Sequence, residues 1–177
     1  SYGKDFYELL DNEMGAFTLI EGEEGYQDYY FFALKGTEIM RQFITAMYLG
    51  EGLRDPLGSR ELINFDGNID IPVYRIEKEG FMPSFVSGIP GRKDFTHFLF
   101  YANYLVFGDS VESLREFVYA NLLGKTLAND PYSREVSTHF SSRSNLFIYG
   151  DPSLFYDRMV SALLPRAAKT MEKEELS

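Results

Sequence analysis

The chain has 177 residues, of which 45% are hydrophobic and 25% are charged, so it can bury a sizeable core and is not disordered. No apolar run approaches the 18 residues that suggest a membrane-spanning helix. A net charge of −10 disfavours nucleic acid and anionic membranes as partners, and the absence of cysteine excludes thiol catalysis, disulfides and cysteine-ligated metals.

The first elements expected along the chain are a leading helix and two strands. The leading segment is 1–13, with its helix over Asp5–Leu10, and it looks like the closing helix of an earlier unit in a longer parent chain. Strands follow over Ala16–Glu21 and Asp28–Leu34. The run Tyr29–Leu34 is apolar on both faces, which predicts a sheet that is covered on both sides or lines an apolar cleft.

A helix is predicted over Thr37–Leu49, where apolar residues recur at helical spacing. Gly50 is expected to end this helix in the left-handed conformation. Asp55-Pro56 then has the pattern of an N-cap followed by proline at the first helical position, so a short helix should begin there. A strand over Ile69–Ile76 contains Pro72, which predicts an edge position.

After a closing helix at Phe81–Ser87, the second half is expected to contain the same elements in the same order. Two strands, Phe95–Tyr101 and Tyr104–Gly108, are joined by a tight turn at Ala102-Asn103. A helix over Val111–Leu123 follows, capped by Asp109 and Glu112 and ended by Gly124. The last elements are a short helix after Asp130-Pro131, a strand over Asn145–Tyr149, and a helix over Pro152–Leu164 that begins after Asp151. Residues 165–177 form a charged tail.

The two halves resemble each other in sequence. When the chain is aligned with itself at a shift of 74 positions, eight of the 24 residues of Tyr30–Leu53 are identical, against roughly one or two expected by chance. The identical pairs are Tyr30/Tyr104, Glu38/Glu112, Arg41/Arg115, Phe43/Phe117, Ala46/Ala120, Leu49/Leu123, Gly50/Gly124 and Leu53/Leu127. The Glu–Arg pairs lie three residues apart on their helices and are expected to have a structural role.

These patterns predict an α+β fold of two tandem units of about 75 residues. Each unit has the order β-β-α-α-β-α, and the units span approximately 14–88 and 94–164. An internal pseudo-two-fold relates them, and helices pack against their sheet or sheets. The whole chain, 1–177, is expected to be a single domain.

Few residues indicate chemistry. His97 and His139 lie at non-equivalent positions of the two halves, so they do not predict a shared metal or a catalytic pair. Asp66, Asn68, Asp70 and Glu77 match four positions of a calcium loop, but Ile71 stands where that loop needs glycine, so a turn at Asp66-Gly67 into a strand is favoured over a calcium site. No catalytic, cofactor-binding or metal-binding residue is expected, and no cofactor.

One part of the second half resembles a known family. The run from Tyr104 to Ser110, then Leu114, then the segment Leu127–Tyr132, is similar to a bacterial extracytoplasmic family known only as a domain of unknown function. The resemblance covers about 45 residues. It implies an exported or membrane-anchored protein and carries over no functional residue. The first half departs from the family's pattern at Gly36-Thr37, where an acid and a serine would be expected.

Three functions follow from these observations. The first is a non-enzymatic interaction or scaffold module of a bacterial cell-envelope protein, located in the periplasm or at the cell surface, in which exposed tyrosines such as Tyr29 or Tyr30 contact a protein partner. The second is a carrier of an apolar ligand or lipid in a cleft lined by Phe and Tyr, with a volume of several hundred Å³. The third and least favoured is a hydrolase that uses carboxylates such as Asp66 or Glu77.

Overall fold

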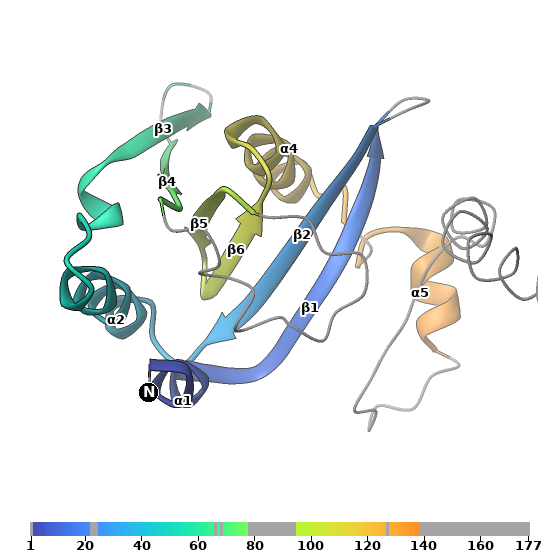
Figure 1. The fold of residues 1–177 in the computed structure, drawn as a ribbon. Coiled ribbons are helices and arrows are strands. Elements are labelled where there is room, and N and C mark those ends of the chain that lie inside the picture. Colours follow the sequence, from blue (N-terminus) through green and yellow to red (C-terminus); the bar gives the residue numbers. More distant parts are fainter. Residues whose placement is uncertain are drawn as a thin grey trace, which may run out of the picture. The chain divides into compact units, whose positions relative to one another are not determined.

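The computed structural model describes residues 2–21, 25–65, 67, 69–77, 95–126 and 128–138. Its elements, in chain order, are α1 (Tyr2–Leu9), β1 (Leu10–Glu21), β2 (Gly25–Leu34), α2 (Thr37–Gly50), the short 3-10 helix η1 (Pro56–Gly58), β3 (Arg60–Phe65), β4 (Ile69–Arg75), β5 (His97–Tyr101), β6 (Tyr104–Gly108), α4 (Val111–Leu122) and α5 (Pro131–Ser137) (Figure 1).

The chain divides into two compact units, Ser1–Asp130 and Pro131–Ser177. The second unit is described only over 131–138, where α5 begins at Pro131 as the Asp-Pro pattern predicts. The elements expected at Phe81–Ser87, Asn145–Tyr149 and Pro152–Leu164 lie outside the described residues, as do Asp151, His139 and the tail 165–177.

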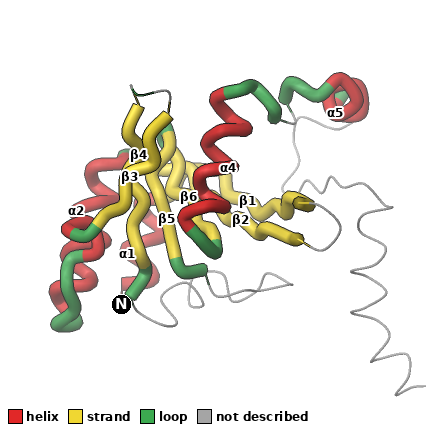
Figure 2. The backbone as a smooth tube through the Cα atoms, turned by 90° about the horizontal axis from the view of Figure 1, so that it is seen from above, coloured by secondary structure: helices red, strands yellow, loops and turns green. Residues whose placement is uncertain are grey.

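The first unit is built around a six-stranded sheet with the order β1-β2-β6-β5-β4-β3, in which every neighbouring pair is antiparallel. Because side chains alternate across a strand, the apolar run of β2 supplies both faces. Tyr30, Phe32 and Leu34 join one core cluster with α1 and α2, whereas Tyr29 joins another with α4. Figure 2 shows these helices on opposite sides of the sheet. The α+β class and the covered sheet are therefore confirmed.

The two hairpin–helix segments, β1-β2-α2 and β5-β6-α4, are arranged differently in space. Their inner strands, β2 and β6, pair antiparallel at the centre of the sheet. A two-fold axis perpendicular to the sheet would relate such strands and would place both helices on the same face. Since α2 and α4 cover opposite faces, this axis does not relate them, and no internal repeat is shown within the described residues.

Two helix ends differ from the prediction. Gly50 stays helical, and the left-handed residue is Gly52, with φ 74°, after which Leu53 packs against the core. The cap of α4 is Ser110 rather than Asp109, because the Asp109 carbonyl accepts a hydrogen bond from Thr96 Oγ1 at 2.6 Å and so remains tied to the sheet. Ser110 and Ser113 form a reciprocal capping box. The predictions for Gly124, with φ 67°, and for the Asp55 cap are confirmed.

Strand β3 is absent from the prediction, and it changes the position of β4. Because β3 pairs along β4, β4 lies inside the sheet, and its assignment as an edge strand is wrong. The Ile76 N–H bonds to the Thr96 carbonyl on the β5 side. Because backbone groups alternate between the two sides of a strand, the nitrogen of Pro72, four residues earlier, points to the β5 side as well. The register of β4 with β5 covers only Val73–Arg75. Pro72 thus lies just past the end of this ladder, where a missing N–H costs no hydrogen bond.

Candidate functional site

A bulge near the start of β1 creates the polar pocket that is the candidate site. Leu10 pairs with Leu34, and Met14 pairs with Phe32. Three residues of β1, Asp11–Glu13, therefore lie opposite the single residue Ala33 of β2. Extra residues in one strand bend it and re-aim its side chains, and such bulges are frequent next to functional sites.

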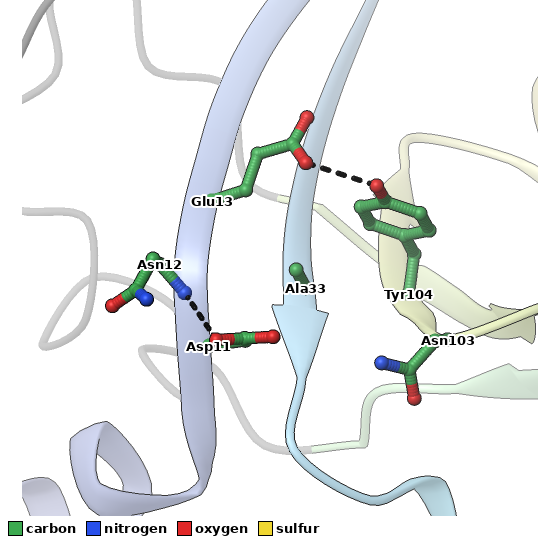
Figure 3. Close-up of a pocket in the computed structure, with 6 residues that line it drawn as sticks. All are labelled: Asp11, Asn12, Glu13, Ala33, Asn103 and Tyr104. Carbon is green, nitrogen blue, oxygen red and sulfur yellow. Dashed lines mark hydrogen bonds between the residues drawn. The ribbon is translucent and has the colours of Figure 1, made fainter. Parts of the chain in front are cut away.

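The pocket has a volume of about 300 Å³ and is lined by Asp11, Asn12, Glu13, Ala33, Asn103 and Tyr104 (Figure 3). The side chain of Glu13 reaches from β1 past Ala33 of β2 toward β6. There its Oε2 accepts a hydrogen bond of 3.0 Å from the Tyr104 hydroxyl. The small side chain of Ala33 leaves room for this crossing, so three neighbouring strands contribute to one hollow.

The wall of the pocket formed by Asn103 and Tyr104 is held in place by the turn between β5 and β6. Ala102 takes the left-handed conformation there, with φ 50°. The Leu34 N–H donates to the Asn103 carbonyl at 2.9 Å, and the Asn103 side-chain amide donates to the Leu34 carbonyl. The turn is thus joined to the end of β2 through two hydrogen bonds.

Aromatic packing supports the same wall. The Tyr104 ring contacts Phe31 edge-on, with ring centroids 5.9 Å apart. The Phe31 ring in turn covers Gly15, where a Cβ would lie 2.5 Å from a ring carbon. Glycine is therefore required at position 15 for the ring to occupy this place.

Acceptors dominate the electrostatics of the pocket. Among the described residues that line it, there are two carboxylates and no basic side chain. The hydrogen bond to Glu13 raises the pKa of Tyr104, with smaller contributions from burial and from the charges of Glu13 and Asp11. The phenol therefore stays protonated at neutral pH and keeps donating to Glu13. Such an arrangement favours a cation or a group rich in hydrogen-bond donors.

The sequence prediction missed this pocket. It placed residues 1–13 in a leading segment and gave no role to Asp11, Asn12 or Glu13. The signal that was present is a run of three polar residues between a helix and a strand. Their convergence with Asn103 and Tyr104 depends on the pairing of β2 with β6, which no local pattern encodes.

The residues considered for calcium do not gather into a site in the described part of the chain. Gly67 has φ 74°, as a turn at Asp66-Gly67 requires, while Asp66 and Asn68 lie outside the described residues. Asp70 is instead occupied by a 2.7 Å hydrogen bond from Asn64 of the paired strand. Across the described ranges, no group of three or more His, Asp or Glu side chains is placed to hold a metal.

His97 lies on β5, where its Nδ1 is 2.8 Å from Thr96 Oγ1. Burial lowers its pKa, and so does Arg75 to a smaller degree, while Glu61 and Asp109 act in the opposite direction. The imidazole is therefore neutral at pH 7.

The tyrosines expected to contact a partner are buried. Tyr29 is fully buried and Tyr30 is 5% exposed, so the expectation of an exposed contact there is wrong. The reason is that β2 is an interior strand with a helix on each side. The Tyr29 hydroxyl donates to the Ser113 carbonyl of α4 at 2.8 Å, which gives this residue a structural role.

The chain matches no family model, no curated protein and no solved structure. Among the helices of the described residues, none has the length and apolar character needed to cross a membrane.

Proposed function

We propose that this chain is a non-enzymatic interaction module of a bacterial cell-envelope protein, and that its bulge pocket receives a cationic side chain of a protein partner. The observation that carries the proposal is the lining of the pocket. Its described lining residues include the carboxylates of Asp11 and Glu13 and no basic side chain. The envelope location rests on the family resemblance of the strand–helix segment alone.

A lysine or arginine side chain fits this pocket chemically. Hydrogen bonds between a charged donor and a carboxylate are about twice as strong as neutral ones. The Tyr104 hydroxyl holds the Glu13 carboxylate in position before binding, so little side-chain entropy is lost there when a cation arrives. A net charge of −10 also favours the approach of a basic partner.

The volume of the pocket is consistent with one side chain. About 300 Å³ is at the lower limit for small-molecule sites. Of the described residues in its lining, Tyr104 alone is aromatic, and this differs from the Phe/Tyr-lined cleft expected of a lipid carrier. The apolar faces of β2 pack against the chain's own helices. The carrier remains a prediction from the sequence.

Selection from a library of random peptides tests the proposal. Phage displaying random 12-residue peptides are selected on the wild-type protein, and the enriched peptides are then measured against two double variants. Asp11→Asn with Glu13→Gln removes the pocket's charges, and Asp5→Asn with Glu8→Gln removes the same charge from exposed positions of α1.

We expect enriched peptides to contain lysine or arginine. They should lose about tenfold or more in affinity for the pocket variant and keep their affinity for the α1 variant, because one charged hydrogen bond contributes about 1.5–3 kcal/mol. Peptides that bind the pocket variant as tightly as the wild type would refute the proposal, as would a set without basic residues.

A further inference from the structure

The first strand, β1, forms one edge of the sheet among the described residues. In the part of the chain that the structure describes, β1 pairs with β2 alone. Along a strand, the backbone N–H and C=O groups of successive residues point alternately to the two neighbouring strands. The Leu34 N–H bonds to the Asn103 carbonyl on the β6 side. Phe31, three residues earlier, therefore directs its N–H and C=O groups toward β1. Phe31 faces Gly15, and the neighbours of Gly15, Met14 and Ala16, therefore point their N–H and C=O groups outward.

Between the bulge at Asp11–Glu13 and its last residue, Glu21, β1 lacks the charges and the prolines that commonly block strand addition at an edge. Edge strands are normally short, or carry charges and prolines along their length. β1 has 12 residues, about twice the usual strand length, and its stretch Met14–Ile20 contains no charge and no proline. Met14 and Ala16 are exposed. The opposite edge strand, β3, has only six residues and begins with the charged pair Arg60 and Glu61.

Charge identifies the kind of segment that fits the edge. β1 carries Asp11, Glu13 and Glu21, and no lysine or arginine. Antiparallel pairing with a second copy of β1 would bring the acidic ends of the two strands together, and like charges across a strand pair are destabilising. A basic segment would instead place opposite charges side by side.

We infer that the β1 edge binds an extended, basic segment of a protein partner as an additional strand of the sheet. Main-chain hydrogen bonds to Met14 and Ala16 supply affinity that does not depend on the segment's sequence, and a lysine or arginine beside the bulge reaches Asp11 or Glu13. The inference rests on the proposed function, since the pocket selects the basic residue, and it adds the conformation in which the partner binds.

Amide hydrogen exchange measured by NMR, with the selected 12-residue peptides as the probe, tests the inference. Strand addition should slow exchange at the Met14 and Ala16 amides at least tenfold when peptide is added. Ala16→Pro removes an outward N–H without removing a bond to β2, and the matched control Ala16→Ser keeps that N–H. Affinity should fall about tenfold in the proline variant, corresponding to about 1.4 kcal/mol, and stay unchanged in the serine variant.

The outcomes separate the two proposals. Peptides that depend on Asp11 and Glu13 but leave exchange at Met14 and Ala16 unchanged would overturn strand addition and retain the pocket. Peptides that slow this exchange but ignore the pocket charges would support strand addition and overturn the cation site. If Ala16→Pro does not fold, as judged by circular dichroism, the exchange rates of the wild-type protein decide.

Discussion

Arg41 and Arg115 occupy equivalent positions in the aligned halves of the sequence but have very different surroundings in the structure. Arg41 donates to the Tyr74 hydroxyl at 2.7 Å, and its guanidinium carbon lies 4.2 Å from the centroid of the Phe100 ring. Arg115 pairs with Glu112 at 3.0 Å on the surface of α4, where the Glu112 side chain is exposed and the Arg115 side chain is partly exposed. We therefore predict unequal effects when each arginine is replaced by methionine, which keeps the aliphatic stem and removes the charge.

The magnitude follows from burial. Tyr74 is 1% exposed, so Arg41→Met leaves its hydroxyl buried without this partner, at about 1–3 kcal/mol. Loss of the cation–π contact adds about 0.5–2 kcal/mol. We expect a total near 2–4 kcal/mol of unfolding free energy and a fall in Tm of roughly 5–15 °C. Arg115→Met should cost about 0.5 kcal/mol or less, because exposed ion pairs contribute little.

Urea unfolding followed by circular dichroism measures both variants under the same conditions. Adding Tyr74→Phe to Arg41→Met should restore part of the stability, because it removes the buried hydroxyl that lost its partner. Unfolding free energies of the two arginine variants that agree within about 0.5 kcal/mol, or no recovery with Tyr74→Phe, would contradict this prediction.

Three further predictions concern stability. Burial, with smaller effects of nearby glutamates, raises the pKa of Tyr48 from 10.0 to about 12, so the unfolded state loses this proton first. The stabilisation is complete below pH 10, and about 2 kcal/mol of unfolding free energy should be lost by pH 12. The Tyr48→Phe variant should not show this loss, and an equal loss in that variant would contradict the assignment. Burial lowers the pKa of His97, so the unfolded state binds its proton more readily and the free energy of unfolding should fall as the pH drops below 6.5. His97→Gln should weaken this pH dependence when unfolding is measured from pH 7.5 to 5. An unchanged slope in the variant would contradict the sign of the shift. A Cβ at Gly108 would lie 3.0 Å from the buried side chain of Leu114. Gly108→Ala should therefore lower the free energy of unfolding, measured by calorimetry, by about 1–3 kcal/mol. An unchanged free energy of unfolding would show that α4 shifts freely.

Much of the local structure could be predicted from the sequence because its signals are local. The strand Tyr104–Gly108 has the predicted bounds, and the helix at Thr37 extends one residue further than expected. Helical spacing of apolar residues and a tight turn involve only near neighbours in the chain. The errors at Gly50 and Asp109 arose where tertiary contacts moved a helix end by one or two residues. Leu53 packs on the core, and the Asp109 carbonyl accepts a hydrogen bond from Thr96, which directly precedes β5.

Burial and strand position depend on pairing between distant segments. Tyr29 and Tyr30 are hidden because β6, from the second half of the chain, adds to β2 and helices cover both faces. The edge position predicted from Pro72 is wrong because β3, which the sequence analysis did not predict, pairs along β4 and places it inside the sheet. The pocket could not be predicted, since Glu13 and Tyr104 are 91 residues apart.

Composition and spacing alone determined that this chain forms a packed α+β unit with a sheet apolar on both faces, because the amount and periodicity of apolar residues dictate what must be buried. The tertiary structure decided the order of the six strands, the placement of α2 and α4 on opposite faces, and the meeting of Asp11, Glu13 and Tyr104 at a bulge. These features depend on which strands pair and in which register. The free energy that favours one pairing comes from packing throughout the core, so no single segment of the sequence determines it.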